Sequence, residues 1–124
     1  MPLKTQDKIE KEILNTEEFF ERVQKDKKLF INILDVFAKD FRHKREKLGL
    51  ALKRKDFSGI ASLTHSLKGA CANIAAKKLK NTCVLIEDAA VKNDFSLIKK
   101  ELAQLDSSFK ELLKYIAKLK IQLK

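Results

Sequence analysis

The chain is 124 residues long, the size of one ordinary domain and too short for two well-formed ones. Hydrophobic residues make up 44% of it and charged residues 35%, which is typical of a soluble globular protein. Because there are only one proline and three glycines, turn signals are scarce, and the composition favours an all-α fold.

The first half of the chain predicts short helical segments followed by a long helix. Residues 1–14 carry a loose apolar pattern among charges, which predicts an N-terminal arm or a short helix. Asn15 is expected to cap a short helix with Phe19 on its apolar face, and Asp26 is expected to cap the next helix. Beyond Asp26 a stripe at helical spacing predicts a long helix, and its apolar members are Leu29, Phe30, Ile33, Leu34, Phe37, Phe41, Leu48 and Leu52.

The second half predicts three further helices. Asp56 or Ser58 is expected to cap a helix that runs to about Ile74. The next stripe consists of Leu79, Cys83, Ile86 and Ala90. Asp94 is expected to cap a final long helix, which extends to Ile116.

Short connections between amphipathic helices are typical of antiparallel neighbours. The sequence therefore predicts an all-α fold, an up-down antiparallel four-helix bundle with an additional short N-terminal helix. We expect a single domain over residues 1–124, with the bundle over residues 15–124.

His65 lies in the predicted helix that follows Asp56, but it faces away from the apolar stripe. At about 100° per residue, it is about 170° from the middle of that stripe. Its neighbours on the same face are mostly small, namely Ala61, Lys68, Gly69 and Ala72. Gly69 costs a helix interior about 1 kcal/mol relative to alanine, and the missing side chain lets a backbone or a phosphoryl group approach the imidazole. These features make His65 a candidate for chemistry.

The formal net charge of +10 comes mostly from lysines scattered along the chain. Such a distribution usually describes a solvated surface, and a bias towards an acidic partner is the alternative. Nucleic acid is not expected as a partner, because arginines are few, tryptophan is absent and aromatic residues do not alternate with basic ones. An even charge distribution favours a monomer.

Cys71 and Cys83 fall on apolar stripes and are expected to be buried free thiols, although a disulfide between neighbouring helices stays open. Two histidines and two cysteines without ligand spacing predict no metal site. Without a signal peptide or an apolar run of about 18 residues, the chain is expected to be cytoplasmic and not bound to a membrane.

The stretch from Ile60 to Ala90 resembles the histidine-containing phosphotransfer (HPt) domain of two-component phosphorelays. That family's pattern is a helix with His-x-Leu-Lys-Gly, an Asn-Leu-Gly-Ala corner, and a second helix with Cys-x-x-Leu-Glu. The matching residues here are His65, Leu67, Lys68, Gly69, Asn73, Ile74, Ala76, Leu79, Cys83, Ile86 and Glu87. Asp-Phe pairs at 56–57 and 94–95 extend the resemblance beyond this stretch.

The sequence departs from the family pattern at two positions. Thr64 stands where alanine is usual, and Ala75 stands where the corner glycine is usual. Because alanine tolerates a positive φ poorly, we expect a helical or slightly kinked junction at Ala75. The family accepts glutamate or glutamine at the position of Glu87, so the resemblance does not dictate a charge there.

The resemblance implies that His65 accepts a phosphoryl group from the aspartate of one receiver domain and passes it to the aspartate of another. Lys68 would then stabilise the phosphoryl charge, Gly69 would provide steric clearance, and Glu87 would orient the imidazole. The receiver would supply Mg²⁺, so this domain would need no cofactor and would have no independent catalytic activity. A basic surface around His65 would speed encounter with the acidic receiver site.

Three hypotheses stay open. The leading one is a phosphotransfer module, either free-standing or the last domain of a hybrid sensor kinase. The alternatives are the phospho-accepting domain of a chemotaxis-type histidine kinase, or a basic helical adaptor that is not phosphorylated. Replacing His65 by alanine would abolish function under the first two hypotheses and would leave the function of an adaptor unchanged. His43, which lies between Arg42 and Lys44 without small neighbours, is interpreted as a surface residue.

Overall fold

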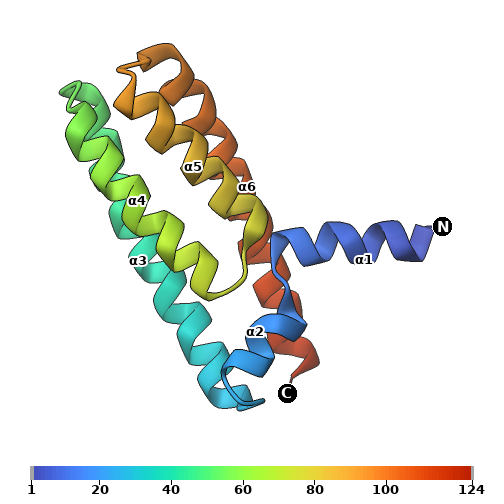
Figure 1. Cartoon of the computed structure of the whole chain (residues 1–124). Coiled ribbons are helices and arrows are strands. Elements are labelled where there is room, and N and C mark those ends of the chain that lie inside the picture. Colours follow the sequence, from blue (N-terminus) through green and yellow to red (C-terminus); the bar gives the residue numbers. More distant parts are fainter. Residues whose placement is uncertain (1, 124) are drawn as a thin grey trace.

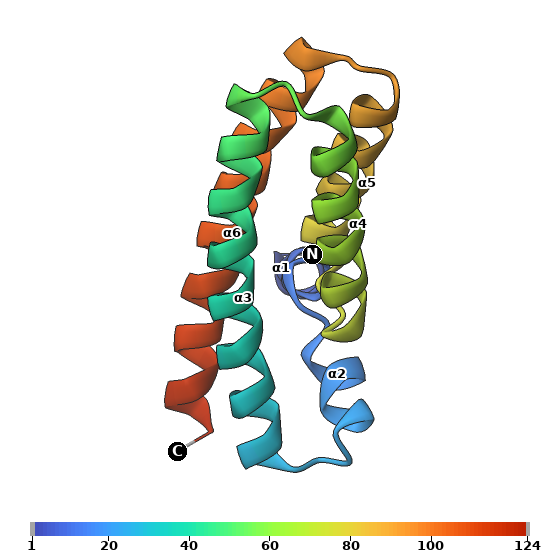
Figure 2. The same ribbon diagram turned by 90° about the vertical axis from the view of Figure 1, so that its left-hand side faces the viewer.

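The structure, a computed structural model, describes residues 2–123, and it describes side chains from residue 7 onwards. Within this range all regular structure is helical, and the elements are α1 (Pro2–Ile13), α2 (Thr16–Arg22), α3 (Lys27–Lys53), α4 (Phe57–Asn73), α5 (Lys77–Val91) and α6 (Phe95–Gln122). Helices α3 to α6 run alternately up and down beside one another (Figures 1 and 2). The predicted all-α fold is confirmed. Of the two forms predicted for residues 1–14, the structure has the helix, and Met1 lies outside the described residues.

Aspartates cap three of the four bundle helices. The side chain of each accepts a hydrogen bond from the backbone N–H three residues further on, which satisfies one of the free donors of the first turn. The pairs are Asp26 with Leu29, Asp56 with Gly59, and Asp94 with Leu97. The predicted caps Asp26 and Asp94 are confirmed, and of the two candidates for α4 it is Asp56 that forms the cap.

Three-residue turns connect the bundle helices, and all three have one geometry. The middle residue has a positive φ in each, 51° at Lys55, 62° at Ala75 and 55° at Asn93. The N–H groups of the middle and last residues donate to carbonyls of the preceding helix, as in a Schellman motif. These tight turns hold consecutive helices antiparallel.

Ala75 does not form the helical or slightly kinked junction that the sequence predicted. Its φ of 62° lies in the left-handed region, which costs a residue with a Cβ about 1 kcal/mol or more. Hydrogen bonds of the turn offset this cost, because Ala75 N–H donates to the Ala72 carbonyl and Ala76 N–H donates to the Cys71 carbonyl. The Ala75 carbonyl also accepts from the N–H of Asn15 at 2.9 Å. The prediction was wrong because the hydrogen bonds of the turn, together with the contact from Asn15, outweigh the local preference of alanine.

A single hydrophobic core runs along the bundle. Its fully buried members from α3 to α6 include Phe30, Leu34, Phe41, Leu48, Ile60, Leu67, Ile86, Ile98 and Leu105. Helix α2 packs against the lower part of this core, where the ring centroids of Phe19 and Phe30 lie 5.0 Å apart. Helix α1 leaves the bundle at a steep angle, and it contacts α5 and α6 (Figure 1). None of the helices in the described range combines the length and the apolar character needed to cross a bilayer.

Candidate functional site

Helix α4 has an apolar face towards the core and a polar face towards solvent. Ile60, Leu67 and Cys71 are buried on the inner face. Thr64 is buried beside them, and its hydroxyl donates to the Ile60 carbonyl at 2.8 Å, which satisfies the hydroxyl where the family pattern has alanine. The side chain of His65 is 69% exposed, so its predicted outward orientation is confirmed.

Glu87 of α5 joins His65 and Lys68 of α4. One carboxylate oxygen lies 2.9 Å from Nδ1 of His65, and the other accepts from Nζ of Lys68 at 2.7 Å. Only 21% of the Glu87 side chain and 29% of the Lys68 side chain are exposed, so this pair is largely sheltered from water. The predicted residues therefore meet in one cluster, built across the two helices.

The cluster orients the ring of His65 and selects the tautomer of its neutral form. The hydrogen bond from Lys68 is the largest influence and lowers the pKa of Glu87. Burial, the next largest, opposes it, and the hydrogen bond from His65 is a smaller influence that also lowers this pKa. Glu87 is therefore ionised at neutral pH. Because an ionised carboxylate only accepts hydrogen bonds, Nδ1 carries the proton in the neutral form of the ring, and in that form the free lone pair is on Nε2.

Gly69 lies one turn beyond His65 and is exposed. A Cβ at this position would meet no heavy atom within 4 Å, so no packing contact inside the described chain requires glycine. Its φ is not positive either, so the backbone does not require it. Ala61 and Ala72 are half-buried on the same side of α4, and they add no bulk around the imidazole. The face around His65 is thus open to a large partner.

Lys44 of α3 also lies beside this site, and the sequence patterns did not single it out. Its Nζ donates to the hydroxyl of Ser66, the residue after His65, at 2.7 Å, and it pairs with Asp40 at 3.0 Å. The sequence around Lys44 does not predict this contact, because Lys44 and Ser66 come together only when α3 packs against α4. Both lysines next to His65 are therefore engaged with acidic side chains.

The buried cysteines contribute no nucleophile. Cys71 and Cys83 are both buried free thiols, as predicted. Hydrogen bonding to Cys83, together with burial, raises the pKa of Cys71, so its reactive thiolate is suppressed. Within the described residues, no group of three or more histidine, cysteine or acidic side chains is arranged to hold a metal ion.

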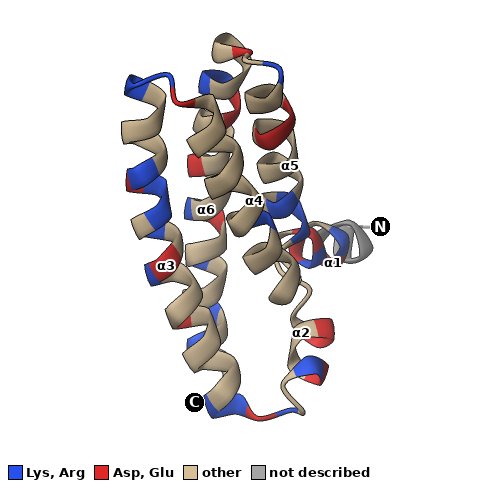
Figure 3. Ribbon diagram, turned by 60° about the vertical axis from the view of Figure 1, so that its left-hand side comes forward, with Lys and Arg blue, Asp and Glu red and all other residues tan. Residues whose placement is uncertain are grey.

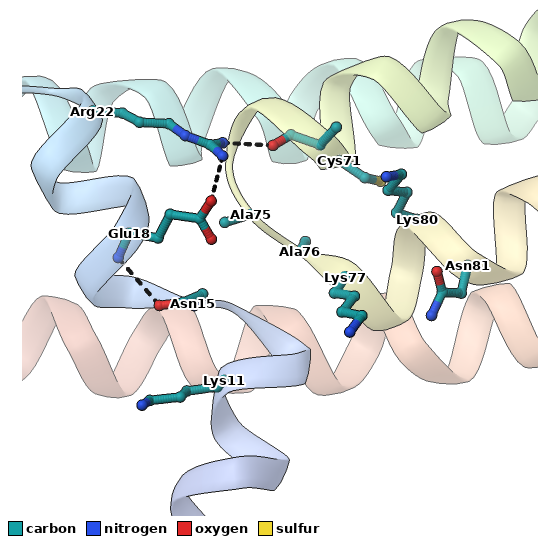
Figure 4. A pocket seen from close by; sticks show the side chains of 11 residues that line it. Lys11, Asn15, Glu18, Arg22, Cys71, Ala75, Ala76, Lys77, Lys80 and Asn81 are labelled. Atoms are coloured by element: carbon teal, nitrogen blue, oxygen red, sulfur yellow. Dashed lines mark hydrogen bonds and ion pairs between the residues drawn. The ribbon is translucent and has the colours of Figure 1, made fainter.

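A cavity of about 290 Å³ lies at the α4–α5 corner rather than at His65. Arg22 reaches from α2 to this corner, where it donates to the carbonyls of Ala72 and Asn73 at 2.7 and 2.9 Å and pairs with Glu18 (Figure 4). These contacts bind the guanidinium to carbonyls at the end of α4, and the Ala72 carbonyl also accepts from the N–H of Ala75. Lys11 and Lys77 also line the cavity, but Figure 4 shows their ammonium groups pointing in different directions. We therefore assign the corner a role in holding α4.

Comparisons with known proteins agree with this geometry. Residues 32–119 match the Hpt domain family. Histidine-containing phosphotransfer protein B from Pseudomonas aeruginosa PAO1 has a similar structure, with a TM-score of 0.82 and 19% identity over 89% of this chain and 96% of that one. A histidine-containing phosphotransfer protein from maize is similar with a TM-score of 0.74 and 20% identity over 86% of each chain. The comparison with curated proteins gave no match.

At these identities the two structures show the shared fold alone. The family match is the stronger finding, because it covers most of the chain and includes His65, Lys68, Gly69 and Glu87. The chain therefore belongs to the Hpt domain family, whose role is histidine phosphotransfer in two-component phosphorelays.

Proposed function

We propose that His65 is the phosphorylated residue. Its Nε2 accepts a phosphoryl group from the aspartyl phosphate of one receiver domain and later passes it to the aspartate of another. The observation that carries this proposal is the 2.9 Å contact between Nδ1 of His65 and Glu87, since it leaves Nε2 as the nucleophile on an exposed ring. Phosphorylation at Nε2 rather than Nδ1 is the specific product that this geometry supports.

The forward step exchanges one bond to phosphorus for another. The Nε2 lone pair forms the N–P bond while the acyl O–P bond of the aspartyl phosphate breaks, and its electron pair leaves with the aspartate carboxylate. Because Nδ1 keeps its proton, the phosphorylated ring gains positive charge. The Glu87 carboxylate lies where it stabilises that charge, and the reverse of these changes delivers the phosphoryl group to the next receiver.

Lys68 acts through charge. Its ammonium group has three N–H donors, of which Glu87 uses one in the unphosphorylated protein. The remaining donors are available to phosphoryl oxygens on His65, one turn away on the same helix. Gly69 leaves room for the backbone of the receiver as it approaches the imidazole.

The receiver supplies the remaining chemistry in this proposal. Mg²⁺ and the phosphorylated aspartate belong to the receiver, so the domain needs no cofactor of its own. We further propose that the unbound domain is a monomer and works in the cytoplasm. Sedimentation of the purified chain and fractionation of cells test these two points.

The experiment is transfer from a receiver domain that carries ³²P-labelled aspartyl phosphate to the native chain and to His65→Ala. We expect label on the native chain only, stable in alkali and lost in acid, with ³¹P NMR identifying the Nε2 isomer. Equal labelling of His65→Ala would overturn the assignment of the nucleophile. If the chain binds receivers and never takes up label, the adaptor hypothesis would replace the relay.

A further inference from the structure

One end of the bundle carries a block of unpaired positive charge. The α3–α4 and α5–α6 turns meet at this end, and Figure 3 shows blue segments in both. No cation of the block forms an ion pair with a described residue, and all are exposed. The block, called here the basic end, consists of Lys53, Arg54, Lys55, Lys92 and Lys99.

The two acidic residues in these turns do not cancel the charge. Asp56 and Asp94 are the caps of α4 and α6, where their side chains accept from the backbone of Gly59 and Leu97. Even when both carboxylates and that of Asp88 in the last turn of α5 are counted, five positive and three negative groups leave the basic end with a net charge of +2. This charge is available to a partner.

The opposite end of the bundle is more nearly neutral. Three of its cations pair with carboxylates, Arg22 with Glu18, Lys25 with Glu21 and Lys120 with Asp35. Lys27 and Lys28 form no ion pair there with a described residue. The surroundings of His65 are also balanced, because Lys68 pairs with Glu87 and Lys44 with Asp40. The predicted basic surface around His65 therefore lies mainly beyond it, at the basic end.

Phe95 organises part of the basic end. The Nζ atoms of Lys55 and Lys99 lie 5.2 and 5.1 Å from the centroid of its ring, so two cations contact one aromatic side chain. The contacts hold both charges near the α3–α4 turn. A ring covered in this way does not offer a free face for stacking on bases, which favours a protein partner over nucleic acid.

The basic end lies within reach of a partner centred on His65. His65 is nine residues after Asp56, which corresponds to about 13 Å along α4 at about 1.5 Å per residue. A standard interface covers about 800 Å² on each partner, equivalent to a disc of about 16 Å radius. Between Asp56 and His65 the outer face of α4 carries small side chains. Ser58 and Ser62 are exposed, and Ala61 is half-buried. A receiver centred on His65 would thus reach the α3–α4 turn, and the α5–α6 turn lies at the same end of the bundle.

We infer that the basic end is a second contact area for the receiver domain, which it attracts through an acidic surface beside the receiver's phosphorylation site. This inference rests on the proposed function and adds the orientation of the partner. The receiver's acidic surface lies over the α3–α4 and α5–α6 turns, while its aspartate faces His65. Charge of this kind mainly raises the rate of association and leaves the transfer step within the complex unchanged.

The test compares two triple variants with the same change in net charge. The first is Lys53→Gln, Arg54→Gln and Lys92→Gln at the basic end. The control is Lys8→Gln, Lys110→Gln and Lys114→Gln, three exposed residues on α1 and α6 that form no ion pair with a described residue. The probe is an unphosphorylated receiver domain, and stopped-flow fluorescence gives the association rate constant at several salt concentrations. Single-turnover transfer at saturating receiver is measured in parallel.

We expect the basic-end variant to associate about five- to tenfold more slowly at low salt, the control to change less than about twofold, and both to match the native rate near about 0.5 M salt. Equal slowing of the two variants would overturn the inference, since net charge alone would then be responsible. Unchanged receiver association combined with lost binding to a DNA duplex would also overturn it, in favour of nucleic acid.

The two measurements test the contact area and the proposed phosphoryl transfer separately. A receiver that associates in the expected way but transfers no label contradicts the relay and supports the contact area. Transfer of label without any difference between the two variants supports the relay and contradicts the contact area. If no receiver associates with the native chain, both are contradicted.

Discussion

The two histidines of this protein are both exposed on long helices of one bundle, but their surroundings differ. His65 of α4 contacts Glu87 of α5 at 2.9 Å, and small residues surround it. His43 of α3 has no hydrogen bond or ion pair to a described residue, and it stands between Arg42 and Lys44. Both side chains are exposed, and the difference is that His65 contacts a carboxylate from a second helix. In the proposed function the contact from Glu87 orients the imidazole of His65, and His43 has no such contact with a described residue.

The strongest test of this comparison removes each imidazole in turn. We expect His65→Gln to lower phosphoryl transfer from a receiver by at least about a thousandfold, because the nucleophile is lost. His43→Gln should stay within about twofold of the native chain. Quench-flow measurement with labelled receiver gives both rates. Comparable losses in the two variants would show that the contact with Glu87 does not select the reactive histidine.

The two lysines beside His65 sharpen the comparison. Lys68→Ala should slow transfer by about ten- to a hundredfold, because one charge-assisted donor to the phosphoryl group is removed. Lys44→Ala, which removes a lysine bonded to Ser66 on the other side of α4, should change the rate by less than about threefold. Single-turnover transfer at saturating receiver separates these effects from binding. A larger loss in Lys44→Ala would place the phosphoryl group on the α3 side.

Substitutions at two glycines test whether phosphoryl transfer depends on the open face of α4. Gly69→Ala should raise the free energy of unfolding by roughly 0.5–1 kcal/mol, because a Cβ there meets nothing and helix propensity improves. It should nevertheless slow transfer by about three- to tenfold if the receiver backbone approaches this position.

The matched control is Gly49→Ala on α3, whose Cβ would lie 3.6 Å from a guanidinium nitrogen of Arg45, an ordinary contact. It should gain similar stability and keep the native transfer rate. Urea unfolding and transfer assays give both quantities. A Gly69→Ala variant that transfers as fast as the native chain would remove the argument for clearance.

The smallest expected effect concerns acid stability. Lys68 and His65 lower the pKa of Glu87 in the folded state, so the carboxylate binds its proton less readily there than in the unfolded chain. This stabilisation is present above the unfolded pKa and is lost as the pH falls through the lowered folded value.

Between about pH 6 and about pH 3, we therefore expect Glu87→Gln to lose less stability than the native chain. Urea denaturation at several pH values measures the difference. Parallel pH profiles for the two proteins would mean that the contact with Lys68 contributes no net stability.

Local patterns predicted most of the helices. Asp26, Asp56 and Asp94 each precede an apolar stripe, and each caps a helix in the structure. The angular position of His65 followed from helical periodicity alone, because every residue advances by a fixed angle. Burial of Phe30 and Phe41 followed from the same spacing.

Other features depended on contacts between distant segments. Ala75 adopts a positive φ because Asn15 and the turn's own hydrogen bonds hold it there, although its local preference is against that conformation. Lys44 was not recognised as a neighbour of the site, since Ser66 reaches it only through the packing of α3 against α4. A basic surface was expected around His65, and the structure pairs Lys68 with Glu87 and Lys44 with Asp40.

Periodicity and side-chain size were enough to predict the all-helical fold, the outward orientation of His65 and the small residues around it. The contacts of Glu87 with Nδ1 of His65 and with Lys68 arise only in the folded bundle, and so does the meeting of the cations of the α3–α4 and α5–α6 turns at one end. The reason is geometric. Residues on different helices approach within hydrogen-bond distance only after the core has fixed the register of those helices, and no pattern within one helix specifies that register.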